Sequence, residues 1–318
     1  MSRGQTPPFF SDTPSDGEFL AQFRSPEPRT RPEAAFSLGK FDPMFWTIFS
    51  SACVLTILYM SFLLQGIVSS ALLLLAAFCL AMSVYSLNRV SDLEEDSINA
   101  PDKGRFIKKN RDYLLFASIE FIDIAVVLAL FTNPVAITVI LFAFCVSVFY
   151  GLGSRRFRLK NVLFLKNMTV AGTMATAAVL LPLAVHANIV FVVLMVAYFI
   201  FLKTLIEGVL HDARDIEGDR KAGVGSVPVA LGINKTRNLL LLLNSTLVVW
   251  LAFALFQAIF YPYIAVLIFS LLYGYWVILR FTRTGAKTSR VWYSLVAGEW
   301  IILALYATPF ALGWPHIL

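Results

Sequence analysis

Long, uninterrupted apolar runs are the feature that most restricts what this chain can fold into. The sequence is 58% hydrophobic and 14% charged over 318 residues, which is too apolar for a soluble domain of this size. The runs are continuous rather than alternating, which favours helices over strands. Nine runs reach the roughly 20 residues that a transmembrane helix needs. They cover residues 44–65, 69–88, 113–131, 133–150, 162–185, 189–210, 239–258, 262–281 and 293–314. We therefore expect an all-α integral membrane protein with nine transmembrane helices.

The positive charges alternate along these runs. All but two of the 26 Lys and Arg residues lie in the N-terminal tail or at the junctions after the second, fourth, sixth and eighth runs; the exceptions are Lys166 and Lys203. The positive-inside rule then predicts a cytoplasmic N-terminus and an outside C-terminus. We expect the protein to lie in the plasma (inner) membrane. The net charge of +6 thus reflects topology, and we expect contact with membrane lipid and no nucleic-acid partner.

The first 43 residues differ from the rest of the chain. They are rich in Pro, Ser and Thr and contain no apolar run, so we expect a largely disordered cytoplasmic tail. Residues 44–318 are expected to form the membrane domain.

Two acidic clusters, at residues 88–96 and 212–219, each follow a long apolar run and lie on the same predicted side of the membrane. If the preceding helices continue, each cluster presents its oxygen ligands on one helical face. The aligned residues are Asn88, Asp92 and Asp96 in the first cluster and Asp212, Asp215 and Asp219 in the second.

Carboxylates at a membrane boundary are costly unless something compensates their charge. Oxygen ligands suit Mg²⁺, which binds a few carboxylates together with phosphate oxygens. The pair of clusters therefore indicates a Mg²⁺–diphosphate site, while either cluster alone is equally consistent with a solvated helix end. Cleavage of an allylic diphosphate needs such a site to stabilise the leaving group. It also needs an apolar tunnel that keeps water from the carbocation.

The clusters resemble the two aspartate-rich motifs of the UbiA superfamily of intramembrane prenyltransferases. Around the first, Asn99 and Pro101 also match, and around the second, Gly218, Gly223 and Val227-Pro228. The resemblance covers about residues 44–314 and implies helices around a central cavity with a cytoplasmic cap. It implies that Asp92, Asp96, Asp212, Asp215 and Asp219 are the catalytic, Mg²⁺-binding residues.

The sequence departs from the family pattern at several positions. Arg89 stands where the family has an aspartate, so we expect it to contact a phosphate. Lys103 takes the place of an arginine, with less bidentate geometry. His211 precedes Asp212 where a lysine is common. The full set of expected substrate-binding residues is Asn88, Arg89, Lys103, Tyr150, Lys160, Asn167, Lys203, Glu207, His211 and Arg220.

The resemblance predicts an enzyme of isoprenoid biosynthesis. It would transfer a prenyl group from a polyprenyl diphosphate to an acceptor that the sequence does not identify, most often aromatic or a quinone precursor. Lipid, carotenoid or sugar-phosphate acceptors, and terpene cyclisation, are alternatives. A transporter or cation channel is the alternative of another class. It would require acids at mid-membrane depth, whereas most acids here lie at one boundary.

A few charged residues lie deeper within the runs. Lys203 and Glu207 are four residues apart on one helix face, which is consistent either with an ion pair between them or with a role in orienting the acceptor or a diphosphate. Glu120 and Asp123 lie in the middle of the third run, and Glu299 lies in the ninth. Because acids facing lipid are costly, we expect Glu120 and Asp123 to face the interior of the bundle.

Overall fold

The computed structural model describes residues 43–93, 97, 101–152, 163–283 and 290–313. Within these ranges the secondary structure consists of helices and turns, with no strand. The tail expected over residues 1–43 lies almost entirely outside the described residues. The helices are α2 (Pro43–Leu64), α3 (Ala71–Ser91), α5 (Pro101–Lys109), α6 (Arg111–Leu130), α7 (Pro134–Leu152), α8 (Leu165–Leu183), α9 (Val190–Arg214), α10 (Ile216–Ala222), α11 (Val227–Leu231), α12 (Ile233–Phe256), η2 (Tyr261–Tyr263), α13 (Ile264–Phe281), α14 (Arg290–Ala297) and α15 (Glu299–Ala311).

Each of the nine expected runs coincides with a helix or a helix pair, which confirms the all-α prediction. Among the described residues, seven segments are long and apolar enough to cross a membrane: α2, α3, α6, α9, α12, η2 with α13, and α14 with α15. The helices α7 and α8 coincide with the other two runs but are not among these seven. The protein is therefore an integral membrane protein, and the expected count of nine spans is not confirmed.

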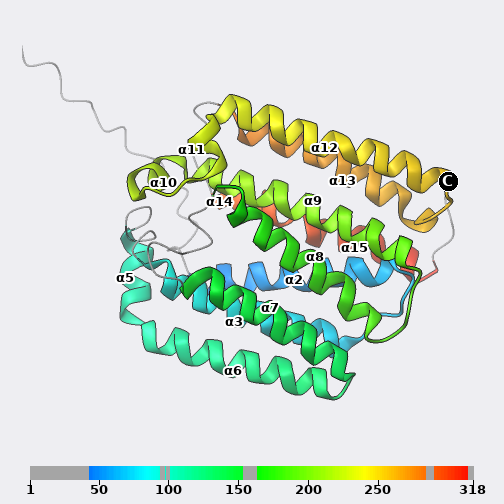
Figure 1. Ribbon diagram of the computed structural model, residues 1–318, viewed down its shortest axis with the longest axis horizontal. Coiled ribbons are helices and arrows are strands. Elements are labelled where there is room, and N and C mark those ends of the chain that lie inside the picture. The colour runs from blue at the N-terminus through cyan, green and yellow to red at the C-terminus, as the bar shows by residue number, and fades with distance from the viewer. Residues whose placement is uncertain (1–42, 94–96, 98–100, 153–162, 284–289, 314–318) are drawn as a thin grey trace, which may run out of the picture. The chain divides into compact units, whose positions relative to one another are not determined.

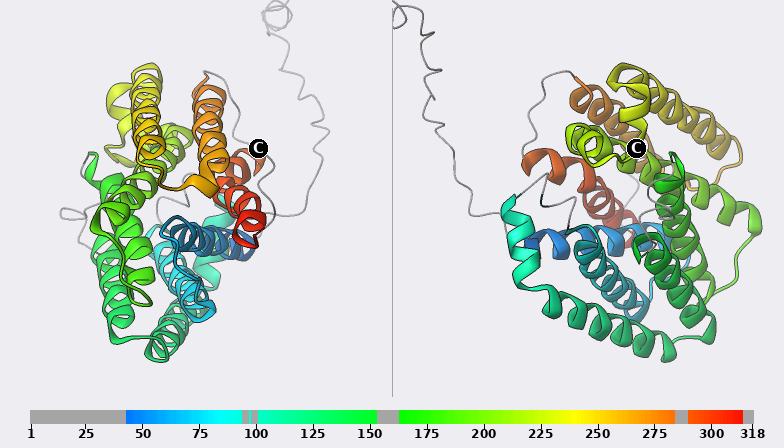
Figure 2. Two further views of the ribbon diagram at one scale, coloured as in Figure 1. Left: turned by 90° about the vertical axis from the view of Figure 1, so that its right-hand side faces the viewer. Right: turned by 60° about the vertical axis from the view of Figure 1, so that its left-hand side comes forward.

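The long helices pack side by side around two apolar clusters (Figures 1 and 2). One cluster joins α2 and α8 to α9, α12, α13 and α15, with Phe199, Trp250 and Trp300 as large buried members. The other joins α2 and α8 to α3, α6 and α7, with Phe62 and Leu73 at its centre. Because α2 and α8 belong to both clusters, they hold the two halves of the bundle together.

Three of the short helices, α5, α10 and α11, lie at the end of the bundle where α3 and α9 finish (Figure 1). At α10 the chain reverses at Gly223, whose φ of +72° is a left-handed conformation that glycine adopts without strain. Gly223 lies between the second acidic cluster and α11, so this turn fixes where the chain leaves the cluster.

The prediction that Glu120 and Asp123 face the bundle interior is wrong. Both are exposed on α6, whose buried residues, Leu114, Ser118, Ile122, Ala125 and Ala129, form the opposite face. Helix α6 packs against α3 and α7, and its outer side is exposed among the residues that the structure describes. The acids therefore lie on the outer surface of the bundle.

Candidate active site

An apolar cavity lies between α2, α3, α7 and α8. Its empty volume is about 860 Å³, a figure that includes the part of the cavity that is open to the outside. At the end where α3 and α7 finish and α8 begins, Tyr85, Asn88, Tyr150 and Thr169 line it. Towards the other ends of these helices, the walls are apolar, with Leu58, Ala77 and Leu181 among them. The cavity therefore suits a long apolar chain with a polar head at the end that carries the acidic clusters.

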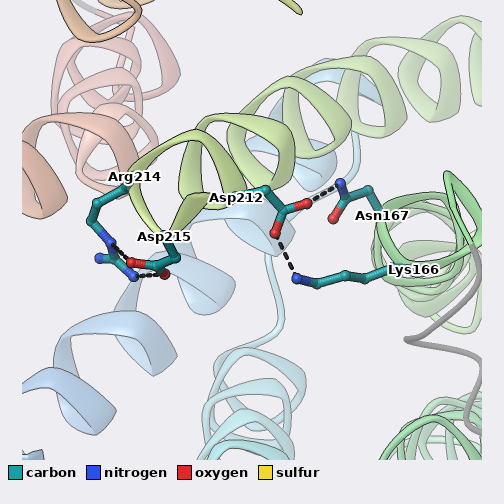
Figure 3. Close-up of polar contacts among 5 residues, drawn as sticks. All are labelled: Lys166, Asn167, Asp212, Arg214 and Asp215. Atoms are coloured by element: carbon teal, nitrogen blue, oxygen red, sulfur yellow. Dashed lines mark hydrogen bonds and ion pairs between the residues drawn. The ribbon is translucent and has the colours of Figure 1, made fainter. Parts of the chain in front are cut away.

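Asp212, on the last turn of α9, is held by two residues of the first turn of α8 (Figure 3). Lys166 Nζ lies 2.6 Å from Asp212 Oδ1, and Asn167 Nδ2 donates to Asp212 Oδ2 over 2.7 Å. Asp212 is 4% exposed and Asn167 is 6% exposed. A buried carboxylate needs such donors to remain charged. Together these contacts fix the start of α8 against the end of α9.

Gly208, one turn before Asp212, allows this close approach. A Cβ atom at position 208 would lie 3.2 Å from Asn167 Oδ1, closer than side chains normally pack. The glycine therefore lets Asn167 lie against α9 and reach Asp212.

Asp215 is paired with its neighbour Arg214. Nε and Nη2 of Arg214 donate to the two carboxylate oxygens of Asp215 over 2.7 Å and 2.6 Å, a bidentate geometry (Figure 3). Helix α9 ends at Arg214 and Asp215 separates it from α10. The prediction that Asp212, Asp215 and Asp219 share one continuous helix is therefore wrong, because Asp219 belongs to a separate helix.

Asp219 on α10 lies close enough to Lys166, Asp212 and Asp215 to interact with all three charges. Burial raises the pKa of Asp219 above its ordinary value, and the two neighbouring carboxylates act in the same direction. Lys166 and Ser226 oppose this shift. The buried Oδ2 atom of Asp219 has no hydrogen-bond partner among the described residues. It is thus an oxygen available to a cation.

The first acidic cluster begins at the end of α3. Asn88 lines the cavity, and its buried Oδ1 atom also lacks a hydrogen-bond partner among the described residues. Asp92 caps α3, and its backbone N–H donates to the carbonyl of Asn88. Helix α3 ends at Ser91, so Asp92 is the cap of this helix and not a further residue on its face. Asp96 itself lies outside the described residues.

Only some of the other expected substrate-binding residues lie near the cavity. Arg89 donates from Nε to Thr47 Oγ1 of α2 over 2.7 Å. Tyr150 lines the cavity, Lys103 is half-buried on α5 and Arg220 is exposed on α10. Lys160 lies outside the described residues. The expected substrate-binding residues that lie at the cavity end or against Asp212 are thus Asn88, Tyr150 and Asn167.

The ion pair between Lys203 and Glu207, one of the two interpretations of these residues, is not what the structure shows. Lys203 Nζ instead lies 2.6 Å from Glu299 Oε1 of α15, and Glu299 accepts a hydrogen bond from Ser270 of α13. All three residues are buried. Glu207 faces His211, with 3.6 Å between Oε1 and Nε2. Lys203 therefore belongs to a buried polar cluster among α9, α13 and α15.

The fit of this site to Mg²⁺ rests on its oxygen atoms. Among the described residues no three His, Cys, Asp or Glu side chains are gathered as a metal site. Asn88 Oδ1 and Asp219 Oδ2 are nevertheless buried oxygens that have no hydrogen-bond partner within the described part of the chain, and oxygen is the ligand that Mg²⁺ prefers. Sequence reasoning did not assign Lys166 to the site. Lys166 stands beside Asn167 at the start of an apolar run, and this position is the sequence signal that could have assigned it to the site.

A membrane-embedded helical bundle whose apolar cavity ends beside buried acids is typical of enzymes that bind amphipathic substrates with a charged head. The comparison with known families agrees with this class: residues 45–296 match the UbiA prenyltransferase family. The chain belongs to this family and is a prenyl-transferring enzyme, which confirms the family resemblance.

Two curated relatives carry the same name. A digeranylgeranylglyceryl phosphate synthase of Saccharolobus solfataricus is 28% identical over 262 residues, 79% of this chain and 88% of that protein. A digeranylgeranylglyceryl phosphate synthase of Methanoregula boonei is 29% identical over 176 residues, 54% of this chain. The second match spans only 60% of the relative's length.

The fold is also that of a solved family member. A UbiA homologue from Archaeoglobus fulgidus, in a structure bound to GPP and Mg²⁺, superposes with a TM-score of 0.64. The alignment covers 85% of this chain and 98% of the homologue at 17% sequence identity. At this identity the likeness establishes the fold.

Proposed function

We propose that this protein binds a prenyl diphosphate with its tail in the cavity and its diphosphate at the acidic end, and transfers the prenyl group to an acceptor. The observation that carries this proposal is the continuity between an apolar cavity and a polar end formed by Asn88 and Tyr150. The solved homologue bound to GPP and Mg²⁺ supports the same substrate class. The apolar walls would hold the tail and exclude water from the allylic cation.

The residues at the acidic end have separate roles in this proposal. Asn88, Asp92 and Asp219 would hold Mg²⁺, which when bound neutralises charge on the departing diphosphate. Lys166 and Asn167 fix the position of Asp212, and Arg214 fixes Asp215. Tyr150 lies within electrostatic reach of Lys166, so it connects the cavity with the acidic cluster. Arg89 and Lys103 would supply positive charge towards the phosphates.

Two acceptor classes have specific support. The family resemblance favours an aromatic or quinone-precursor acceptor. Both curated relatives are named digeranylgeranylglyceryl phosphate synthase, which favours a glyceryl phosphate lipid. We propose the glyceryl phosphate lipid as the first acceptor to test and the aromatic acceptor as the second.

The test is a product assay on purified full-length protein with Mg²⁺. Prenyl diphosphates of several lengths would be combined with a prenylglyceryl phosphate, with an aromatic carboxylic acid or with no acceptor, and products identified by mass spectrometry. Prenylated glyceryl phosphate is the expected product. A prenylated aromatic acid would move the proposal to the second acceptor, and a cyclised hydrocarbon without any acceptor would indicate a cyclase. Absence of diphosphate release from every prenyl diphosphate would contradict the proposed function.

A further inference from the structure

The polar side chains of the apolar cavity are confined to the part that adjoins the acidic clusters, and they form two levels. The outer level, at the acidic end, holds Asn88, Tyr150 and Thr169. The inner level holds Tyr85, Ser147 and Thr173. These lie three or four residues further along the same helices, which is about 4.5–6 Å deeper at the rise of an α-helix. The other residues that line the cavity are apolar.

The two aliphatic hydroxyls of the inner level donate their protons to the backbone of their own helices. Ser147 Oγ donates to the carbonyl of Ala143 over 2.9 Å, and Thr173 Oγ1 donates to the carbonyl of Thr169 over 2.8 Å. A hydroxyl that donates in this way keeps lone pairs that accept hydrogen bonds. On the cavity wall, Ser147 and Thr173 therefore offer a ligand two oxygen atoms that accept.

A prenyl tail does not supply the matching donor, because a hydrocarbon chain has no O–H or N–H group. With the diphosphate at the acidic end, the inner level lies beside the first carbons of the prenyl chain. The acceptor must approach there, since its reacting atom has to come within about 3–3.5 Å of the allylic carbon. A ligand that donates a hydrogen bond at this depth is therefore the acceptor.

The glyceryl phosphate lipid that we propose as the first acceptor has such a donor. Of the three oxygens of its glycerol, one carries the phosphate and one the first prenyl group. The third is a free hydroxyl, and it is the oxygen that receives the second prenyl group. Its O–H bond can point to Ser147 or Thr173 while a lone pair of the same oxygen faces the allylic carbon.

We propose that Ser147 and Thr173 bind the free hydroxyl of the acceptor beside the allylic carbon, and that they select an acceptor with an O–H donor at this point. This inference rests on the proposed function and assigns two residues to acceptor choice. A site that hydrogen-bonds a substrate hydroxyl discriminates against an analogue that lacks it. The preference for the hydroxyl is therefore the property that these two residues control.

The test compares two lipids of the same shape and does not depend on turnover. Purified full-length protein, with Mg²⁺ and a non-reactive geranyl thiolodiphosphate, would be titrated with a prenylglyceryl phosphate. A second titration would use its deoxy analogue, which has hydrogen in place of the free hydroxyl. The wild type should bind the hydroxyl lipid about 2- to 10-fold more tightly, the range expected for one neutral hydrogen bond. The double variant Ser147→Ala, Thr173→Val should bind both lipids equally.

The matched control is Thr138→Val. Thr138 lies on α7, as Ser147 does, and its hydroxyl donates to the carbonyl of Pro134, but it is exposed and does not line the cavity. This variant should keep the wild-type preference, because its hydroxyl has the same kind of backbone bond and no contact with the acceptor. The comparison separates a role in acceptor binding from the general effect of removing a helix hydroxyl.

The wild-type preference is decisive even if the double variant does not fold. Equal affinity for the two lipids, or no binding of either, in a wild type that binds the thiolodiphosphate would overturn this inference and leave prenyl diphosphate binding intact. An undiminished preference in the folded double variant would overturn it as well, as would loss of the preference in Thr138→Val. Failure of the wild type to bind the thiolodiphosphate would instead contradict the proposed function and with it this inference.

Discussion

At the scale of single residues, the site depends on buried polar atoms that satisfy one another. Asn167 is the clearest case, since its amide donates to Asp212 Oδ2 and both side chains are buried. Leaving a buried carboxylate oxygen without its donor costs about 1–3 kcal/mol. The position of Asp212 therefore depends on a residue 45 positions earlier in the chain.

Substituting Asn167→Leu should lower the free energy of unfolding by about 1–3 kcal/mol, because it keeps the side-chain volume and removes the donor. Thermal unfolding in detergent measures the change. Asn188→Leu is a control of the same chemistry, since Asn188 donates to the backbone carbonyl of Gln65 in a partly exposed turn. A smaller loss for Asn167→Leu than for Asn188→Leu would contradict this account of Asp212.

The charge of Asp219 is predicted to destabilise the metal-free protein. Because the folded-state pKa of Asp219 is raised, the folded state favours its protonated form, and stability falls as pH rises through that pKa. Asp219→Asn imitates the protonated form, so with a chelator present at pH 7 it should unfold a few degrees above the wild type. The difference should shrink as pH falls towards about 4. A lower unfolding temperature for Asp219→Asn at pH 7 would contradict the prediction.

At the scale of helices, the buried pair of Lys203 and Glu299 joins α9, which carries Asp212, to α15. Removing one partner of a buried pair leaves the other charge uncompensated and costs about 3–5 kcal/mol, whereas replacing both by apolar residues is often neutral. We expect Lys203→Met to destabilise strongly and the double variant Lys203→Met, Glu299→Leu to recover most of the loss in thermal unfolding. Additive losses in the double variant would show that the two charges do not stabilise each other.

Helix α6 presents Glu120 and Asp123 on its outer side, where acids in contact with lipid cost about 2.5–3.5 kcal/mol by insertion measurements. Replacing both by Leu should leave diphosphate release unchanged and stabilise the protein. Ser118→Leu on the opposite, buried face serves as the comparison, because Ser118 packs against Ser83 of α3 and a larger side chain there should destabilise. Loss of diphosphate release in the double Leu variant would mean that the acids have a role in catalysis.

The sequence predicted the helices well and the contacts between them poorly. The apolar runs marked each long helix, because a span in lipid must satisfy its backbone internally. The partner of Lys203 was mispredicted because Glu299 lies 96 residues away in sequence (203 to 299), and local spacing cannot show such a contact. The direction of α6 was mispredicted because its apolar residues surround the whole helix, so no polar stripe indicated its outer face.

At the acidic site, too, local sequence signals were predictive and contacts between helices were not. Asn88, Asp92, Asp212 and Asp219 were predicted from spacing and family resemblance. The break at Asp215 was missed, because nothing local in the sequence distinguishes a helix end from one more helical turn there. Lys166 was missed because its partner Asp212 comes from another helix. Residues expected to bind substrate can thus be predicted from motif spacing, whereas the residues that hold them in place come from other helices.

At the scale of the whole molecule, the cavity between α2, α3, α7 and α8 should limit the length of the prenyl chain. Ala77 lies at the apolar end of this cavity. Ala77→Phe should shift preference towards shorter prenyl diphosphates, measured as relative rates of diphosphate release across a length series. Ala117→Phe, on α6 outside the cavity, is the control. An unchanged length preference in a folded Ala77→Phe protein would place the prenyl tail elsewhere.

The central claim is that the acidic end of the cavity binds Mg²⁺ and a prenyl diphosphate, with both acidic clusters contributing. The most direct measurement is diphosphate release by purified full-length protein, with and without Mg²⁺, for the wild type, Asp92→Ala and Asp219→Ala. Release should require Mg²⁺ and should fall at least tenfold in each variant, since each removes a charged oxygen ligand, and tenfold corresponds to about 1.4 kcal/mol of transition-state stabilisation. Undiminished, Mg²⁺-independent release in both folded variants would contradict the claim.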